Sequence, residues 1–256
     1  QAFQNHLLER CGRTHTSEDI ERAIAMLHQA GVTNYSIDLI SGLPHQTLDD
    51  WHDSLERAIA LAPPHISVYD LTIESGTAFD RWYEPGENPL PSDDATAAIY
   101  RLTRQILTNA GYAHYEVSNY AKPGYACRHN QVYWRNQSYY GFGMGAASYT
   151  QNQRFTRPRK RAEYFPWVAQ GCPIETSPLS ETDQLLETLM LGLRLAQGVD
   201  LTGFTAPIRQ QIQMTLAPEL DAGWVRVQGD RLTLADPEGF LFSNQIIARL
   251  FEQFDV

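Results

Sequence analysis

Apolar positions in the first third of the chain follow two alternating patterns, one with helical spacing and one of short unbroken runs. Ile20, Ile24 and Leu27 recur every three to four residues, which places them on one face of a helix. Thr16 precedes this stretch as a cap, and Gly31 follows it as a stop. The same patterns along the chain predict a helix over 16–31, a strand over 35–40, a helix over 47–62 and a strand over 66–73. Helices and strands that alternate with short loops indicate parallel strands with right-handed crossovers, as in a barrel or an open sheet.

The remaining two thirds of the chain add a different arrangement of elements. A long loop rich in Gly and Pro covers 75–92. After it, the spacing predicts a helix over 92–111, a strand over 115–118, and helices over 180–198, 207–216 and 243–254. Gly229-Asp230 lies between the segments 224–227 and 231–234, which is typical of a hairpin. We therefore predict an α/β fold with two domains, 1–170 and 171–256, separated near 171–180. The second is a small α+β domain that resembles a winged helix.

The charge of the chain argues against nucleic acid as a partner. The 256 residues are 43% hydrophobic and carry a formal net charge of −10, whereas nucleic-acid-binding domains normally present a basic surface. Residues 171–256 contain twelve Asp or Glu, five Arg and no Lys, so a DNA-binding module is the least favoured function. The basic run Arg154–Arg161 is interpreted as a solvated loop. No apolar run approaches the roughly 18 residues that span a bilayer.

The cysteines constrain both location and metal chemistry. Cys11, Cys127 and Cys172 are far apart and odd in number, which indicates a reducing compartment and predicts a cytoplasmic protein. None lies in a short cysteine-rich spacing, so this chain offers no set of cysteines for an iron–sulfur cluster. The first residue is Gln1 rather than Met, and we expect the chain to be part of a longer protein.

Two regions carry residues suited to cofactor chemistry. Asp38 and Thr72, the latter close to Glu74, lie near the carboxyl ends of two predicted strands, where active sites form in (β/α) barrels. An acidic residue there can bind ribose hydroxyls. For Asp38, a helix cap or an ion pair remains the alternative.

The second region is the segment 128–134, Arg-His-Asn-Gln-Val-Tyr-Trp. The imidazole of His129 can ligate haem iron, and Tyr133 and Trp134 can pack on a flat macrocycle. A loop in which His129 and Asn130 only form local hydrogen bonds is the alternative. Cys127 is a rival ligand, because a thiolate also binds haem iron.

Six motifs in the same order resemble one known family, the radical S-adenosylmethionine proteins related to oxygen-independent coproporphyrinogen III oxidase. The resemblance covers essentially the whole chain. Its residues are Gln1-Ala2-Phe3 with 11–15 (CGRTH), 37–47 (IDLISGLPHQT), 65–69 (HISVY), 115–121 (YEVSNYA), 128–134 (RHNQVYW) and 192–200 (GLRLAQGVD).

The resemblance implies a fold and a set of cofactors. The fold is part of an open six-stranded (β/α) barrel, with about its last two strands, followed by the C-terminal domain. The cofactors are S-adenosylmethionine, contacted by Gln1, Arg13, Asp38 and Thr72, and a [4Fe–4S] cluster. The cluster's CxxxCxxC ligands are expected upstream of this chain, so the chain alone is expected to be catalytically inactive.

The resemblance also implies the function. The 128–134 motif favours the haem-chaperone members, which bind haem, here through His129, Asn130, Tyr133 and Trp134, and deliver it to recipient proteins in the cytoplasm. Contact with membrane haem proteins at the membrane surface is also compatible with this function. The alternative is the oxidase, which acts in porphyrin biosynthesis. One position departs from the family: Ala147 stands where its Gly-x-Gly-Ala-His-Ser pattern has histidine. His129 is therefore the one strong imidazole candidate near this loop, and the second haem ligand and the oligomeric state stay open.

Overall fold

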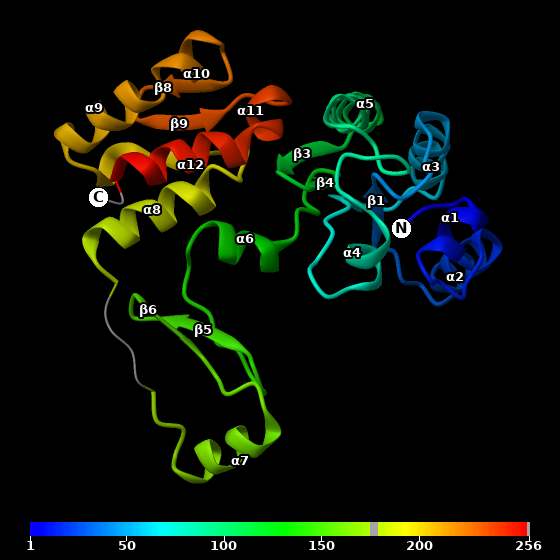
Figure 1. The fold of residues 1–256 in the computed structure, drawn as a ribbon, viewed down its shortest axis with the longest axis horizontal. Coiled ribbons are helices and arrows are strands. Elements are labelled where there is room, and N and C mark those ends of the chain that lie inside the picture. Colours follow the sequence, from blue (N-terminus) through cyan, green and yellow to red (C-terminus); the bar gives the residue numbers. More distant parts are fainter. Residues whose placement is uncertain (175–178, 255–256) are drawn as a thin grey trace. The chain divides into compact units, whose positions relative to one another are not determined.

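The chain forms two compact units in the computed structural model (Figure 1), which describes residues 1–174 and 179–254. Unit 1 is Gln1–Ala126 and unit 2 is Cys127–Val256. The junction predicted from the sequence, near 171–180, lies within unit 2, and part of it falls outside the described residues. The predicted division into domains 1–170 and 171–256 therefore stays a prediction.

Unit 1 is built on a four-stranded sheet with the order β1-β2-β4-β3. Its strands are β1 (Ser36–Ser41), β2 (His65–Asp70), β3 (Ala113–Glu116) and β4 (Asn119–Ala121). The predicted parallel pairing of the first two strands is confirmed, since Ser36 to Ser41 pair in register with His65 to Asp70. The other pairings, β2 with β4 and β3 with β4, are antiparallel.

The strand predicted over 115–118 is wrong in its extent, because the chain turns back on itself there. The amide of Ser118 donates to the Glu116 carboxylate over 3.2 Å, and the ladder between β3 and β4 is irregular between His114 and Glu116. A turn held by a local side chain ends one strand and starts the next within three residues. Apolar spacing alone does not reveal such a turn.

Helices cover one side of this sheet and occupy its connections. They are α1 (Asn5–Arg10), α2 (Ser17–Gln29), α3 (Leu48–Ala60), α4 (Ala78–Trp82) and α5 (Asp93–Asn109). Thr16 and Thr47 each form a capping box, with Asp19 and Asp50 respectively, so both predicted helix starts are confirmed. The short helices α1 and α4 were not predicted, because five or six residues carry too little periodicity.

Alternation along the strands separates an apolar face of the sheet from a polar one. Ile37, Leu39 and Ile66 belong to the main buried cluster, together with residues of α3 and α5. Within that cluster the indole of Trp51 donates to Thr103 over 2.8 Å. Because side chains alternate along a strand, the residues between them point to the opposite face, away from these helices.

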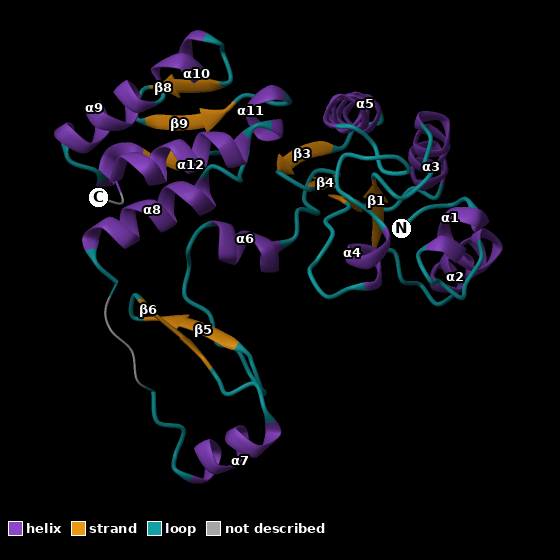
Figure 2. Ribbon diagram, viewed as in Figure 1, coloured by secondary structure: helices purple, strands orange, loops and turns teal. Residues whose placement is uncertain are grey.

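Unit 2 combines a hairpin region with a small α+β domain (Figure 2). Its first elements are α6 (Arg128–Trp134), β5 (Ala147–Thr150), β6 (Gln153–Thr156) and α7 (Arg161–Ala169). The α+β domain contains α8 (Glu181–Gly192), β7 (Val199–Asp200), η1 (Leu201–Gly203), α9 (Ala206–Thr215), α10 (Ala217–Asp221), β8 (Val225–Gln228), β9 (Arg231–Leu234), α11 (Glu238–Leu241) and α12 (Ser243–Phe254).

The predicted hairpin in this domain is confirmed. β8 and β9 pair antiparallel from Val225↔Leu234 to Gln228↔Arg231, and Gly229 has φ +59° in the turn. β7 joins the other edge of β9. The helix α12 packs on α8 and α9. Among the described residues, no helix is both long and apolar enough to cross a membrane.

Candidate functional site

The first candidate site gathers at the free edge and polar face of β1. Gln1 runs along this edge, because its backbone nitrogen donates to the Asp38 carbonyl and its carbonyl accepts from the Ile40 amide, both over 2.9 Å. Asp38 lies on the polar face and is exposed. Its carboxylate accepts a hydrogen bond from Ser36 over 3.2 Å. The carboxylate therefore faces away from the helix layer and is accessible to a ligand.

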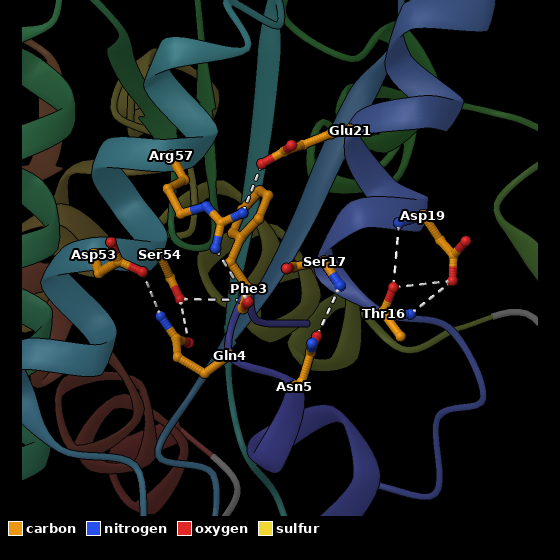
Figure 3. Close-up of polar contacts among 10 residues, drawn as sticks. All are labelled: Phe3, Gln4, Asn5, Thr16, Ser17, Asp19, Glu21, Asp53, Ser54 and Arg57. Atoms are coloured by element: carbon orange, nitrogen blue, oxygen red, sulfur yellow. Dashed lines mark hydrogen bonds and ion pairs between the residues drawn. The ribbon is translucent and has the colours of Figure 1, made fainter.

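The segment after Gln1 is fastened to α3 by a set of polar contacts (Figure 3). The Gln4 amide nitrogen donates to the Asp53 carboxylate over 2.8 Å, while its oxygen accepts from the Ser54 hydroxyl over 2.9 Å. Arg57 donates to the Phe3 carbonyl over 3.3 Å, and its guanidinium carbon lies 4.9 Å from the centre of the Phe3 ring. These contacts fix where the chain passes β1, and hence the position of Gln1.

A second set of contacts in Figure 3 holds α2 to the same segment. The Asn5 side chain accepts from the Ser17 amide over 2.8 Å, and Arg57 pairs with Glu21 over 2.6 Å. Since α1 and the loop that carries Arg13 connect Asn5 to Ser17, both ends of that connection are anchored.

Arg13 lies close to Cys11, within the connection between Asn5 and Ser17. Burial raises the pKa of the Cys11 thiol, against the opposing effect of Arg13. Backbone hydrogen bonds bring Gln1 and Asp38 together, and the placement of Arg13 beside them stays a prediction.

Thr72 lies just beyond the end of β2. It is exposed and follows the last residue of β2 by two positions, whereas Asp38 is the third residue of β1. The predicted convergence of Thr72 with Asp38 is not tested. Thr72 stays a prediction.

A partly buried polar network beside Asp38 was not predicted. The Ser36 hydroxyl lies 2.8 Å from Nδ1 of His65, whose Nε2 lies 2.9 Å from the hydroxyl of Tyr115. His65 is buried, and burial lowers its pKa while Asp38 opposes that shift. Ser36 pairs with His65 in the parallel ladder, so the two side chains share a face. Reading the alternation of both strands together could have found this pair.

The second candidate site is α6, whose side chains point in two directions. Residues four apart share a face of a helix, so His129 lies with Tyr133, and Asn130 lies with Trp134. His129 and Tyr133 are exposed, whereas Asn130 and Trp134 are half-buried. The predicted haem residues therefore divide into an outward pair and an inward pair.

The outward pair begins a row of aromatic rings. The imidazole of His129 meets Tyr133 edge-on at 4.9 Å between ring centres, and Tyr133 meets Tyr139 at 4.6 Å. Tyr139 was not singled out from the sequence, although it follows the motif closely. An exposed imidazole supported by aromatic rings is free to bind a metal through either nitrogen.

Of the inward pair, Trp134 faces the α+β domain of the same unit. Trp134, Asn136, Thr188 and Val199 are among the residues that line a hollow of about 460 Å³. The indole nitrogen of Trp134 is buried, and no hydrogen-bond partner for it is found in the described part of the chain. Trp134 thus helps to anchor α6, and its predicted role as a packing partner for haem stays a prediction.

Polar contacts strengthen this anchorage. Glu187 of α8 accepts from the Asn136 side chain over 3.4 Å and pairs with Arg154 over 3.4 Å. Arg135 donates to the Gln197 side chain, also over 3.4 Å. The end of α6 and the strand β6 are therefore both tied to α8.

Metal-binding side chains are not clustered in the described residues. No group of three or more His, Cys, Asp or Glu could hold a metal ion in that part of the chain, and none of the three cysteines forms a disulfide. His129 is therefore a candidate for a ligand to a metal that arrives within a cofactor.

Comparisons with known proteins bear on the fold and the family of this chain. The model for the radical SAM superfamily matches residues 1–58, and the model for the HemN C-terminal domain matches residues 179–242. The solved structure titled "Coproporphyrinogen III oxidase (HemN) from Escherichia coli is a Radical SAM enzyme" superposes with a TM-score of 0.78 at 21% identity, covering 100% of this chain and 62% of that one. The fold predicted from the sequence is thereby confirmed: the chain belongs to the radical SAM superfamily and carries the HemN C-terminal domain.

Its relatives within that superfamily define the family further. A protein from Synechocystis sp. named heme chaperone HemW is 44% identical over 98% of this chain and 66% of its own length. The Escherichia coli protein of the same name is 34% identical over 96% of this chain and 65% of its own length. The chain belongs to the HemW family. It spans between 52% and 66% of the length of the first curated relatives that it matches.

Proposed function

We propose that this chain is part of a haem-binding chaperone that takes up haem at α6 and delivers it to recipient proteins in the cytoplasm. One observation carries the proposal: His129, in a family whose curated members are named heme chaperone, presents an exposed imidazole next to the rings of Tyr133 and Tyr139. An imidazole can ligate haem iron, and aromatic rings can cover the macrocycle. The absence of disulfides among the three cysteines fits a reducing compartment.

Cys127 is the rival for the iron. It immediately precedes α6 and is half-buried, whereas His129 is exposed and one turn from Tyr133. Exposure favours His129, because a haem group needs room on both faces of the iron. The two candidates give different ligand fields, so an absorption spectrum distinguishes them.

The proposal includes S-adenosylmethionine bound at β1. The residues there fit the molecule: Asp38 offers an accessible carboxylate to the ribose hydroxyls, and Arg13 offers a guanidinium to the methionyl carboxylate. Gln1 provides the backbone edge beside them, and Thr72 is the fourth contact. When bound, S-adenosylmethionine with a [4Fe–4S] cluster supplies radical chemistry to the superfamily. The residues of this chain bind and orient it.

The oxidase function has support from the fold alone. The solved oxidase is 21% identical to this chain, and one fold can serve different functions. The curated relatives carry the chaperone name instead. The chaperone is therefore the function that we propose.

Titration of the purified chain with haem tests the proposal. His129→Ala should weaken haem binding at least about tenfold or shift the Soret band, because the axial ligand is lost. Cys127→Ser should leave both unchanged. His52→Ala, which removes an exposed histidine of α3 in unit 1, is the matched control. Loss of binding in Cys127→Ser alone would assign the iron to the thiolate, and an unaltered chain that binds no haem would refute the proposal.

A further inference from the structure

The segment between α6 and β5 forms a loop that is closed at its base. The backbones of Tyr139 and Tyr149 bond to each other in both directions, over 2.8 and 2.9 Å. Inside the loop, the amide of Gly141 donates to the Ser148 hydroxyl over 2.9 Å. We call residues 140–148 the aromatic loop.

The aromatic loop presents three large apolar side chains to solvent. Tyr140 is 71% exposed, Phe142 is 84% exposed and Met144 is 51% exposed. Single exposed apolar residues are ordinary, but a group of them marks an interaction site. The backbone of the loop is closely packed at Gly141, because a Cβ there would lie 2.0 Å from the Ala147 carbonyl oxygen.

The side chain of Arg157 contacts the aromatic loop. Arg157 donates to the Ser148 hydroxyl over 2.8 Å, and its guanidinium carbon lies 6.0 Å from the ring centre of Phe142 and 5.4 Å from that of Phe155. Ser148 is fully buried. Arg157 therefore holds the loop and its aromatic side chain in place, as a positioning residue.

Basic side chains follow on the next segment. Arg159 is exposed, and its Cγ would lie 3.4 Å from a Cβ placed on Gly145, so it runs along the loop. Lys160 and Arg161 come next, and Glu163 pairs with Lys160 over 3.6 Å. In a chain with net charge −10, this is an unusual concentration of positive charge beside exposed aromatic rings.

The aromatic loop is continuous with the haem-binding candidate on α6. Tyr139, at the base of the loop, contacts Tyr133, which contacts His129. On the other side Tyr139 lies 6.4 Å from Tyr149, between ring centres. A row of rings thus leads from the imidazole to the loop within unit 2.

We infer that the aromatic loop is a second wall of the haem site, with Phe142 and Met144 against the macrocycle and Arg159 paired with a propionate. The inference rests on the proposed function. Haem combines a flat apolar ring with two carboxylates, and this surface combines exposed apolar side chains with an adjacent guanidinium. The occupant is the haem whose iron His129 binds.

The first test measures haem affinity in the purified chain. A double variant, Phe142→Ala with Met144→Ala, should raise the Kd for haem about tenfold or more, because apolar contact with the ring is lost. The Soret position should not change, since the iron keeps its ligand. Met214→Ala is the matched control, because Met214 is equally apolar and 62% exposed on α9.

The second test isolates the propionate. Arg159→Gln should raise the Kd for haem, but not the Kd for haem dimethyl ester, whose propionates are uncharged. Arg226→Gln, an exposed arginine of β8, should leave both unchanged. A charge effect that is equal for haem and for its ester would overturn the assignment of Arg159.

The outcomes separate the two proposals. Haem binding that depends on His129, but not on Phe142, Met144 or Arg159, would overturn the second wall and leave the proposed function standing. An alternative outcome is that the loop variants leave haem binding unchanged and alter binding to anionic vesicles or the oligomeric state. Either result would assign the aromatic loop to contact with a membrane or with a second copy of the chain. An unaltered chain without haem affinity would overturn both.

Discussion

The hydroxyl of Ser36 lies 2.8 Å from Nδ1 of the buried His65 and 3.2 Å from the carboxylate of Asp38. One hydroxyl therefore connects a buried imidazole to an exposed acid across two parallel strands. A serine has one hydrogen to donate and two lone pairs, so Ser36 can bond to Asp38 and to His65 at the same time.

Acidification should destabilise the fold through His65. Burial lowers the pKa of His65 below its usual value near 6.5, so the unfolded chain takes up the proton first as the pH falls. The free energy of unfolding should therefore decrease as the pH falls below about 6.5, until the pKa of the folded state is reached. Urea denaturation between pH 7.5 and pH 5.5, conditions chosen to bracket that window, measures this loss.

His65→Gln provides the comparison. The variant should lose less stability on acidification than the unaltered chain, whereas His52→Gln, which changes an exposed histidine, should not differ. Equal pH slopes for all three proteins would contradict the role of His65.

Asp38 should contribute directly to binding of the nucleoside. Asp38→Ala should lower the affinity of the chain for S-adenosylhomocysteine by about 10- to 100-fold, because hydrogen bonds to a charged acceptor are lost. Ser36→Ala should have a smaller effect in the same direction. Isothermal titration calorimetry measures both, with Asp49→Ala, an exposed acid in the first turn of α3, as the control. Affinity that is unchanged in Asp38→Ala would remove this residue from the site.

The glycines of the 192–200 motif are explained by close packing. A Cβ on Gly198 would lie 2.0 Å from the Leu232 carbonyl oxygen, and its φ is +63°. Gly198→Ala should lower the free energy of unfolding by about 3 kcal/mol or more. Gly229→Ala, at φ +59° in open space, should cost only about 1 kcal/mol. Denaturant titrations of both variants measure the difference, and equal losses would show that φ alone is responsible.

The chain by itself should not cleave S-adenosylmethionine. Its three cysteines belong to no group that could hold a metal among the described residues, and reductive cleavage in this superfamily needs an electron from the cluster. We expect no 5′-deoxyadenosine after incubation with dithionite, iron and sulfide, as analysed by chromatography. Detectable product would show that the chain assembles a competent cluster.

Much of the fold was predictable because long helices and parallel strands leave a clear period. The capping boxes at Thr16 and Thr47 and the hairpin at Gly229 are local signals, and the structure confirms each. The turn at 116–119 was missed, because it depends on a Glu116 side chain that bonds to a backbone amide two residues ahead.

The candidate sites were predictable as residue types but not as arrangements. Asp38 could be selected from its strand, yet its link to His65 needs the register of two strands. Trp134 was grouped with His129 because they are neighbours in the motif. Their separation into different faces follows from a helix over 128–134 that the sequence did not identify as one.

The helix α6 carries two side chains with different surroundings, His129 and Trp134, within less than two turns. At 3.6 residues per turn, the side chains of His129 and Trp134 diverge by about 140° around the axis. The indole is seated on the α+β domain while the imidazole is turned outward. If His129 is the iron ligand that we propose, loosening of α8 near Glu187 should alter the orientation of its imidazole. Unfolding of the C-terminal domain would then shift the absorption spectrum of bound haem.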